Sequence, residues 1–313
     1  MTDSIELGDG REFDIIRELL ARWGPRALGI GDDAAMIHPA AGEQLVVSTD
    51  SSVEHIHFER AWLTPREIGY RATTAALSDL AAMAASPIGV LLALGLPRSW
   101  LDVVGELGDG VGDAIDAAET LVRGGDITGA SDLTIGVTVL GGTDAPLRRN
   151  GARIGDTVYV TGSLGGPGAA LAAWQRGDAP DAAARARFAH PVARIREALW
   201  LARGGARAGI DISDGLLADA GHMAAASGVR IQLDLEQLPL HEGATPREAA
   251  TSGEEYELIV CAPALNVSAF ERATKLSLTA IGRVLEPVPD GIGVTARMNG
   301  ETVATPREFR HFA

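Results

Sequence analysis

The order of apolar and polar positions predicts that helices and strands alternate along the first part of the chain. Phe13, Ile16, Leu19 and Leu20 recur at helical spacing and predict a helix over 12–23. Thr64-Pro65 is a typical start signal for a helix, which we expect to run to about Ala85. The remaining patterns predict a helix within 99–122, a turn at 124–126, and strands at 43–50, 87–97 and 133–141.

A second set of helices and strands follows a turn-rich segment at 142–156. We therefore expect two domains, residues 1–143 and 144–313. The fold class is α/β or α+β, because helices and strands alternate in both parts. The second part is predicted to contain helices at 165–177, 194–204 and 265–274, a helix after residue 214, and strands at 157–162, 209–213, 228–235, 255–262 and 279–284.

The composition restricts the class of protein. Apolar residues make up 46% of the 313 residues but aromatic residues only 4%, so the core must be built mainly from Ala, Val, Leu and Ile. The net charge of −15 predicts that the chain repels nucleic acid and anionic membranes. The most apolar stretch, 75–96, contains Asp79 and Pro87, so we expect no membrane span. The acidic first ten residues do not look like a signal peptide.

The cysteine count adds a further limit. Cys261 is alone, which excludes an internal disulfide and a zinc site with several thiolates. A single thiol fits a reducing compartment, and we expect a cytoplasmic protein.

The stretch "GIDISDGLLADAGHM" (209–223) places carboxylates beside core residues. If 209–213 is a strand, Asp211 and Ser213 share one of its faces, and Asp214 is a natural helix N-cap. These side chains would then meet at a helix N-terminus, which favours phosphate. The alternative is an ordinary Asp cap beside a surface acid. Asp219 is expected to be an exposed helix residue.

Other acids repeat this pattern along the chain. Asp32 and Asp33 lie in a glycine turn, "STD" ends a strand, and Asp126 follows two glycines. Asp79 stands on an apolar helix face, where a carboxylate must be paired, protonated or bound to a cation. Hard oxygen ligands of this kind select Mg²⁺ or Ca²⁺, and Mg²⁺ accompanies phosphate. The alternative for each acid alone is a solvated or capping side chain. A structural calcium-binding protein is a further alternative, but a calcium loop clusters its ligands locally, whereas these acids are spread along the chain.

The familiar nucleotide-binding motifs are absent from the sequence. The one lysine, Lys275, does not belong to a Gly-Lys-Ser/Thr loop, and the protein-kinase motifs are missing. His55 and His57 would share one face of a strand, but zinc is disfavoured because other soft ligands are lacking nearby. Arg149 suits a nucleotide phosphate or an exposed linker position. Glu254 and Glu255 suit a cationic ligand group or solvent, and are not expected in the core.

Six ordered motifs together resemble the thiamine-monophosphate kinase family, which belongs to the superfamily of aminoimidazole ribonucleotide synthetase and selenophosphate synthetase. They are "GIGDDAAMI", "VSTDSSVEHIHF", "ALSDLAAMAASPIGVLLALGLP", "RGGDIT", "DISDGLLADAGH" and "SGEEYEL". The family usually has Gly at the position of His55 and Gly-Gly-Glu-Asp in place of "SGEE". The resemblance implies the two-domain aminoimidazole ribonucleotide synthetase-like fold, with dimerisation through the N-terminal sheets to form a homodimer.

The resemblance also implies roles for individual residues. ATP would contact Gly125, Asp126, Arg149 and Ser213, and thiamine monophosphate would contact His57, Glu254 and the aromatic Phe309. Several Mg²⁺ ions would be held by the hydroxyl and carboxylate groups of Asp33, Ser48, Thr49, Asp50, Asp79, Asp126, Asp211 and Asp214.

The implied reaction converts ATP and thiamine monophosphate to ADP and thiamine diphosphate. Because the acceptor is already an anion, no protein general base is needed, and we expect direct in-line transfer in which Mg²⁺ offsets phosphate repulsion. The alternatives are another ATP-dependent enzyme of the superfamily or a non-catalytic nucleotide-binding scaffold. A selenophosphate synthetase would need an early catalytic cysteine, whereas Cys261 is late in the chain.

Overall fold

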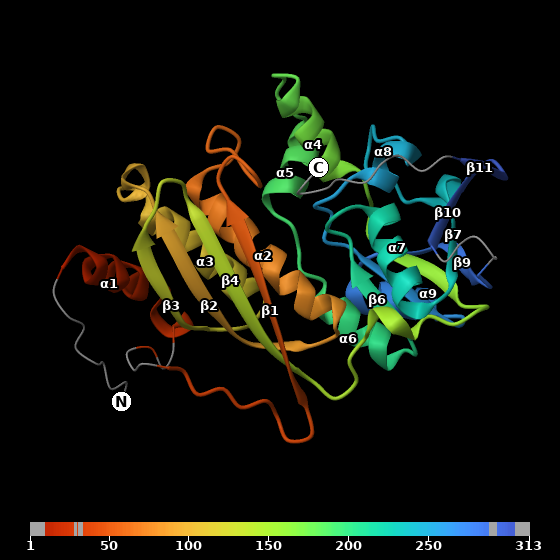
Figure 1. Ribbon diagram of the computed structural model, residues 1–313, viewed down its shortest axis with the longest axis horizontal. Helices are drawn as coiled ribbons and strands as arrows, with labels where there is room; N and C mark the ends of the chain where they lie inside the picture. Colours follow the sequence, from red (N-terminus) through yellow and green to blue (C-terminus); the bar gives the residue numbers. More distant parts are fainter. Residues whose placement is uncertain (1–9, 28–29, 31–33, 288–292, 304–313) are drawn as a thin grey trace. The chain divides into compact units, whose positions relative to one another are not determined.

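The computed structural model describes residues 10–27, 30, 34–287 and 293–303. The chain folds into two compact units. Unit 1 comprises Met1–Leu80 and Ala85–Asp144, and unit 2 comprises Ala81–Ala84 and Ala145–Ala313. Each unit has its own sheet (Figure 1).

Unit 1 contains a four-stranded sheet in the order β1-β4-β2-β3. Strand β4 is antiparallel to both β1 and β2, whereas β3 is parallel to β2. Helices α2 and α3 lie behind this sheet in Figure 1. The bounds are α1 Arg11–Trp23, η1 Gly24–Arg26, β1 Gln44–Val53, α2 Pro65–Ala82, β2 Ser86–Leu96, η2 Arg98–Trp100, α3 Val104–Ala117, β3 Val122–Gly129 and β4 Thr134–Thr143.

The core of unit 1 lies between the sheet and helices α2 and α3. One face of the sheet contributes Val90, Leu92 and Val137, each at most 4% exposed. The two helices approach so closely that their backbones touch at glycine positions. A Cβ atom on Gly110 would lie 1.8 Å from the carbonyl oxygen of Arg66, and one on Gly69 would lie 2.1 Å from that of Leu107. Only glycine permits this approach.

Unit 2 contains a seven-stranded sheet in the order β11-β10-β7-β9-β5-β8-β6. Among these described strands only the β10–β7 pair is parallel, and the other pairs are antiparallel. The strands are β5 Thr157–Thr161, β6 Ala208–Asp211, β7 Arg230–Asp234, β8 Leu258–Ala262, β9 Leu278–Leu285, β10 Gly293–Met298 and β11 Glu301–Val303. The helices are η3 Arg149–Gly151, α4 Gly166–Gln175, α5 Ala182–Ala189, α6 Ile195–Arg203, α7 Leu216–Ser227, η4 Leu235–Gln237, α8 Pro246–Thr251 and α9 Val267–Thr274.

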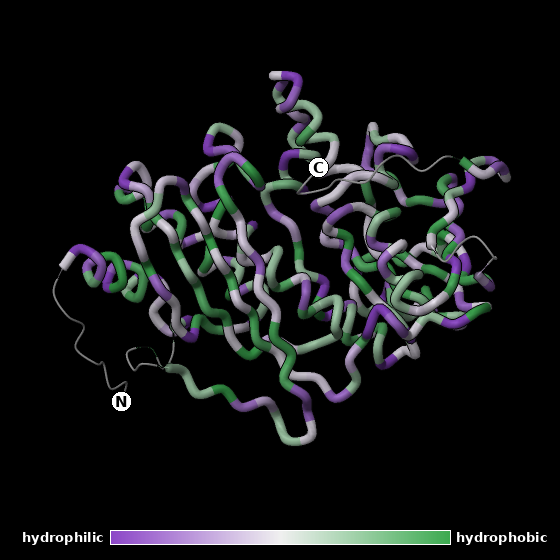
Figure 2. The backbone as a smooth tube through the Cα atoms, viewed as in Figure 1, coloured by the Kyte–Doolittle hydropathy of each residue, from purple (hydrophilic) through white to green (hydrophobic). Residues whose placement is uncertain are grey.

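Helix α7 packs its apolar side on the sheet of unit 2. Its residues Leu216, Ala220 and Met223 join the strand residues in one buried cluster, and the central strands are correspondingly apolar in Figure 2. Cys261 belongs to this cluster, and its sulfur lies 3.9 Å from the sulfur of Met223. Burial raises the pKa of the Cys261 thiol to about 12, so the thiol is chemically inert.

The sequence patterns predicted most of these elements. The fold class is confirmed, and helices α1, α2, α4, α6 and α9 fall at the expected places. Helices α5 and α8 and strands β10 and β11 were not predicted. The prediction of a turn at 124–126 is wrong, because these residues belong to β3. No described helix is long and apolar enough to cross a membrane.

The backbone contact between α2 and α3 makes a testable prediction. We expect Gly110→Ala to destabilise the protein by about 1–3 kcal/mol, because the added methyl group must push the helices apart. Gly112→Ala in the same helix is the matched control, since its Cβ would lie 3.4 Å from its nearest neighbours. The control gains helix propensity of up to about 1 kcal/mol. Urea unfolding measures both, and equal stabilities for the two variants would contradict the close helix contact.

Candidate functional site

The first group of candidate ligands lies on the helix-covered face of the unit 1 sheet. Ser48 and Asp50 on β1 pair with Val139 and Val137, which are at most 1% exposed. The Oγ atom of Ser48 donates a 2.5 Å hydrogen bond to Oδ2 of Asp79 on α2. The structure therefore brings Ser48 and Asp79 together and places Asp50 on the same face. It also explains how a carboxylate is tolerated on an apolar helix face, because a hydroxyl partner faces it.

Two other candidate ligands of unit 1 lie on the opposite face of the same sheet. Asp126 on β3 pairs with Ala93 on β2, Ala93 pairs with Gly136 on β4, and Gly136 pairs with Ser51 on β1. Paired residues share a face, so Asp126 lies on the same face as Ser51. Since successive residues of a strand point to opposite faces, Asp126 is on the face away from Asp50, as is Thr49. Strands β1 and β3 are opposite edges of the sheet, about 14 Å apart at about 4.8 Å per strand. One Mg²⁺, with ligands at about 2.1 Å, cannot bind Asp50 and Asp126 of one chain.

The glycines before Asp126 have a structural reason. The register between β2 and β3 shifts at Val90/Leu91, where β3 contains one additional residue. Gly124 has φ +158, and a Cβ atom on Gly125 would lie 2.0 Å from the carbonyl oxygen of Leu92. The glycines thus permit a β-bulge and close strand contact rather than a turn.

The two histidines lie in a turn after β1, not on a strand as expected. The N–H of Val53 donates to Nδ1 of His57 at 3.1 Å. A neutral His57 ring therefore carries its proton on Nε2, which makes this atom a donor suited to a phosphate oxygen. His55 pairs instead with Glu59 at 2.8 Å, and this hydrogen bond raises the pKa of His55.

The second group lies at the junction of β6 and α7 in unit 2. Asp211 ends β6 and is 4% exposed, Ser213 is half-buried, and Asp214 is exposed. The sequence predicted that Asp214 is the N-cap of α7, and this prediction is wrong. Gly215 occupies that position with φ +125, and it has no side chain that could accept a hydrogen bond from the first turn of the helix. Asp211, Ser213 and Asp214 are consequently held on one short loop between a strand and a helix.

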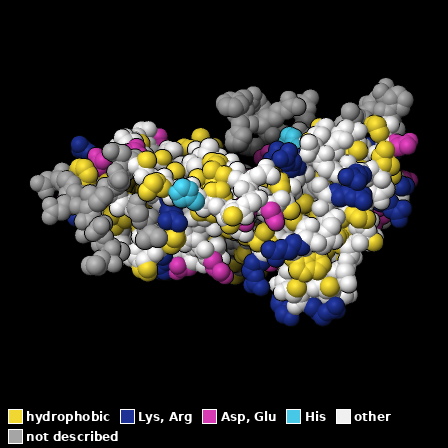
Figure 3. Space-filling view, turned by 90° about the horizontal axis from the view of Figure 1, so that it is seen from below, with side chains coloured by type: hydrophobic (Ala, Val, Ile, Leu, Met, Phe, Trp, Pro, Cys, Tyr) yellow, Lys and Arg dark blue, Asp and Glu magenta, His cyan; other side chains and the backbone are white. Residues whose placement is uncertain are grey.

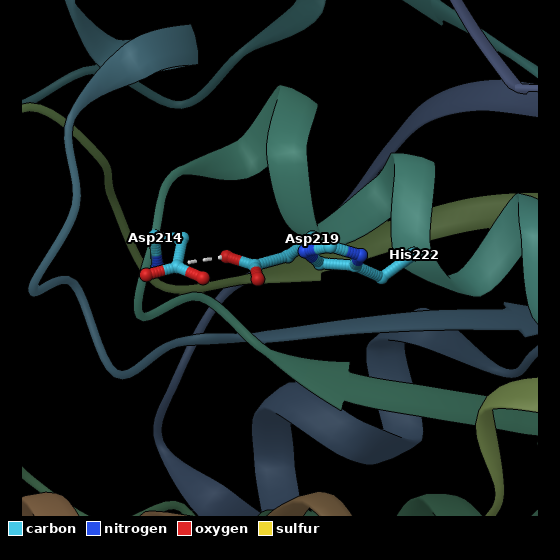
Figure 4. A group of neighbouring side chains, drawn as sticks. All are labelled: Asp214, Asp219 and His222. Atoms are coloured by element: carbon cyan, nitrogen blue, oxygen red, sulfur yellow. Dashed lines mark hydrogen bonds between the residues drawn. The ribbon is translucent and has the colours of Figure 1, made fainter. Parts of the chain in front are cut away.

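Asp219 organises this loop. It is 2% exposed, so the prediction that it is an exposed helix residue is wrong. Its Oδ2 atom accepts hydrogen bonds of 3.1 Å from the N–H groups of Ser213, Asp214 and Gly215. Figure 4 shows its carboxylate pointing towards Asp214, with His222 on the following turn of the helix. One ligand atom from each of these three side chains falls within 4.8 Å of the others.

The electrostatics of the loop favour a cation. Burial, followed by the charges of Asp211 and Asp214, raises the pKa of Asp219 to about 8, against the opposing effect of the N–H groups of Gly215 and Asp214. Burial and the two neighbouring carboxylates thus destabilise the ionised form of Asp219. A divalent cation relieves this repulsion, and carboxylate and hydroxyl oxygens are ligands that Mg²⁺ prefers.

The segment 253–257 is hydrogen-bonded alongside the same loop. The N–H of Glu254 donates to the carbonyl oxygen of Ser213, and that of Tyr256 to Ile212, both at 2.8 Å. Glu254 and Tyr256 have φ values of +65 and +52, a conformation that is rare for residues with side chains. The Tyr256 hydroxyl donates to Oε2 of Glu254 at 2.5 Å. The structure therefore brings Glu254 together with Ser213 and fixes its carboxylate.

Glu255 and Glu257 point into the protein and form a buried ionic cluster. Glu257 is 0% exposed and binds Arg187 and Arg194 at 3.1 and 2.5 Å, and the Thr161 hydroxyl donates to it at 2.7 Å. Glu255 is 1% exposed, so the expectation that it lies outside the core is wrong. Its Oε1 accepts a 2.6 Å hydrogen bond from the N–H of Gly165, and Arg187 lies 3.8 Å from Oε2.

Arg149 lies apart from the β6–α7 loop. The Ser227 hydroxyl, at the C-terminal end of α7, donates to the carbonyl oxygen of Arg149 at 2.7 Å. Helix α7 rises about 16 Å between Leu216 and Ser227, so Arg149 and Ser213 cannot contact the same phosphate group within one chain. Asp33 and Phe309 lie outside the described residues.

Sequence reasoning missed Asp219 and Glu257, although both leave a signal. Asp219 falls between Leu216 and Met223 on the apolar stripe of α7, which is the argument that singled out Asp79. Glu257 shares the strand face of the buried Ile259 and Cys261. A carboxylate at a core position of a periodic pattern predicts a buried partner.

Comparison with known proteins adds family information. The family model "AIR synthase related protein, N-terminal domain" matches residues 31–143, and "AIR synthase related protein, C-terminal domain" matches residues 153–292. The thiamine-monophosphate kinase of Escherichia coli K12 is 34% identical over 307 residues, covering 91% of this chain and 92% of the relative.

Two solved structures are similar over nearly the whole chain. The crystal structure of thiamine-monophosphate kinase from Stenotrophomonas maltophilia has 36% identity, covers 94% of this chain and 98% of its own, and has a TM-score of 0.81. AaThiL complexed with AMPPCP and TMP has 31% identity, covers 99% and 100%, and has a TM-score of 0.76.

The buried Glu255 predicts a pH dependence of stability. Burial raises its pKa from 4.5 to about 7, so the folded chain holds a proton that the unfolded chain has lost. Its contribution is fully present below pH 4.5 and is lost as the pH rises through 7, by about 3 kcal/mol. As the pH rises from about 5 to about 8, we therefore expect the unfolding free energy of Glu255→Gln to increase relative to that of the wild type.

Urea unfolding at about pH 5 and about pH 8 tests this expectation. Glu248→Gln is the control, because a hydrogen bond from Thr245 lowers the pKa of Glu248 and its titration is complete below this range. The difference between the control and the wild type should be the same at both pH values. Parallel profiles for Glu255→Gln and the wild type would exclude a raised pKa at Glu255.

Proposed function

Since the chain belongs to the thiamine-monophosphate kinase family of AIR synthase related proteins, we propose that it catalyses the ATP-dependent phosphorylation of thiamine monophosphate to thiamine diphosphate. The observation that carries this proposal is similarity of 31–36% over more than nine-tenths of the chain, including a relative that binds AMPPCP and TMP. The two oxygen-rich groups described above support it, because phosphoryl transfer between two anions requires charge neutralisation, which cations bound by such oxygens would supply.

The donor atoms of both groups fit Mg²⁺. In unit 1 the ion-binding residues would be Ser48, Asp50 and Asp79, and in unit 2 they would be Asp211 and Asp214, with Thr49, Asp126 and Asp33 as further candidates. All are carboxylates or hydroxyls, the hard oxygen ligands of this ion. Bound Mg²⁺ supplies neutralisation of phosphate charge and alignment of the reacting groups.

The chain's own residues would bind and orient the two substrates. Nε2 of His57 would donate to the phosphate of thiamine monophosphate, and the Glu254 carboxylate would face the cationic thiazolium ring. Phe309 would contact the same substrate. Gly125, Asp126, Arg149 and Ser213 would contact ATP, with Arg149 and Ser213 touching different parts of it. Basic side chains gather over unit 2 on the face in Figure 3, so the negative charge of the chain is not uniform.

The proposed chemistry is direct in-line transfer. An oxygen of the substrate phosphate forms a bond to the γ-phosphorus of ATP as the bond to the β–γ bridging oxygen breaks, and ADP leaves with that electron pair. The attacking oxygen is already anionic, so no side chain has to remove a proton. No phosphoenzyme forms.

A coupled assay with ATP, Mg²⁺ and thiamine monophosphate tests the proposal. We expect ADP and thiamine diphosphate in equal amounts, and no turnover when free thiamine or an aminoimidazole precursor replaces thiamine monophosphate. Turnover with free thiamine but not with thiamine monophosphate would contradict the proposed substrate. Turnover only with the aminoimidazole precursor would favour a different enzyme of the superfamily. Absence of all turnover would favour a nucleotide-binding scaffold.

Asp79→Asn tests the metal role in the same assay. We expect roughly a 100-fold or greater loss of turnover at limiting Mg²⁺ and a much smaller change in unfolding free energy, because Asn still accepts the hydrogen bond from Ser48. Asp132→Asn is the control in the same unit, since Asp132 is exposed and bonded to the neighbouring Ser131. Wild-type turnover of Asp79→Asn at limiting Mg²⁺ would remove Asp79 from the metal site.

We further propose that the chain forms a homodimer through the face of the unit 1 sheet opposite helices α2 and α3. This face carries Leu45 and Val47 with 46% and 56% exposure, on the side of β1 that points away from Asp79. Exposed apolar side chains on a sheet face are typical of an interface. Thr49 and Asp126 of both copies would then lie at the interface.

Light scattering after gel filtration tests the dimer. We expect a mass of twice 32.5 kDa for the wild type and a single-chain mass for Val47→Asp, because the buried charge would lack a partner. Ile154→Asp in unit 2 is the control, since Ile154 is also 56% exposed. A wild-type mass of 32.5 kDa at micromolar concentration would contradict the proposal.

A further inference from the structure

The N-terminus of helix α7 departs from the usual arrangement. The first N–H groups of a helix have no partner within the helix and ordinarily attract an anion such as phosphate. Here the N–H groups of Ser213, Asp214 and Gly215, which lead into α7, all point at one oxygen of Asp219. The side chain of Asp219 thus already binds the N–H of the N-cap, Gly215, and the N–H groups of the two residues before it.

This arrangement changes what the loop can bind. Because Asp219 takes up the three N–H groups, they are not available to a phosphate, and the carboxylates of Asp211 and Asp214 leave the loop negative. The loop is therefore suited to a cation and would meet phosphate only through that cation. The backbone that leads into α7 therefore positions acidic side chains and does not bind phosphate directly.

The loop is also held from the other side. The N–H of Glu254 donates to the carbonyl oxygen of Ser213, and a Cβ atom on Gly253 would lie 2.6 Å from the same oxygen. A Cβ atom on Gly215 would lie 3.0 Å from the carbonyl oxygen of Thr251. The loop thus lies between the 251–254 segment and the Asp219 carboxylate, which together fix its backbone.

We propose that Asp219 is a positioning residue, which holds the backbone of 213–215 so that Ser213 and Asp214 present their side chains to a divalent cation and its nucleotide. The proposal rests on the proposed function for the identity of the nucleotide reaction. Asp219 acts through the loop and not by contact with substrate. Three hydrogen bonds end on this single carboxyl oxygen, so one side chain holds three successive backbone N–H groups. Loss of the acceptor leaves these donors without this partner, and the N–H of Gly215 is buried.

Hydrogen–deuterium exchange gives the most direct test. In Asp219→Ala we expect the amides of 213–215 to exchange roughly ten times faster than in the wild type, or more, while strand β8 keeps its exchange rates. In Asp219→Asn the amide oxygen remains an acceptor, so we expect exchange within about threefold of the wild type.

Mn²⁺ binding, measured by electron paramagnetic resonance without nucleotide, gives a second readout, and steady-state kinetics a third. For Asp219→Ala we expect a loss of about 10–100-fold in Mn²⁺ affinity and in kcat, as is typical when a residue that orients metal ligands is removed. The KM for thiamine monophosphate should stay within about twofold. Asp219→Asn should recover most of both losses.

Asp156→Ala is the matched control for a purely structural carboxylate. Asp156 is 1% exposed, accepts a 2.9 Å hydrogen bond from the N–H of Arg153 and pairs with Arg207 at 2.6 Å. We expect this variant to lose thermal stability but to keep its Mn²⁺ affinity and kcat. A positioning role is supported only if the Asp219 variant departs from this behaviour.

Two outcomes would overturn the proposal. Wild-type exchange, Mn²⁺ affinity and kcat in Asp219→Ala would show that the loop needs no support from Asp219. A loss of Mn²⁺ affinity in Asp219→Asn equal to that in Asp214→Asn, with unchanged exchange, would make Asp219 a direct ligand instead. Exchange and Mn²⁺ binding require no turnover, so they test the proposal even if the wild type does not act on thiamine monophosphate. Should Asp219→Ala not fold, Asp219→Asn still separates a positioning residue from a direct ligand.

Discussion

A carboxylate removed from water must find a partner, and this requirement shapes both units. Each solution uses a different partner: a hydroxyl for Asp79, three backbone N–H groups for Asp219, and two arginines for Glu257. Desolvation of an unpaired charge costs several kcal/mol, so these contacts hold their backbone segments in place. Asp50 and Asp214, which are half-buried and exposed, lie on the segments that these contacts hold.

The sequence predicted the fold class and most elements, because the apolar periodicity of α1, α6 and α9 is strong and local. It predicted the candidate acids for a similar reason, since Asp79 contradicts the pattern around it. It failed where a backbone feature depends on a distant strand. The bulge of β3 exists only against β2, so Gly124 and Gly125 were interpreted as a turn. The burial of Asp219 depends on the loop 213–215, whose N–H groups donate to its carboxylate.

Side-chain direction was the other feature that the sequence did not reveal. Motif reasoning assigned Asp50 and Asp126 to several Mg²⁺ ions without saying which residues share an ion, and strand register puts the two on opposite faces and edges. Arg149 and Ser213 are likewise at opposite ends of α7. A motif gives the chemical type of a ligand, whereas the sheet topology decides which ligands can share an ion.

The buried position of Cys261 has a practical consequence. Its thiol is 0% exposed and has a pKa of about 12, so thiolate-selective reagents such as maleimides should leave it unmodified while the chain is folded. A cysteine introduced at any exposed position would then be the one reactive thiol of the protein, because the chain contains no second cysteine. Spectroscopic labels can accordingly be attached at single chosen sites without first removing the native residue.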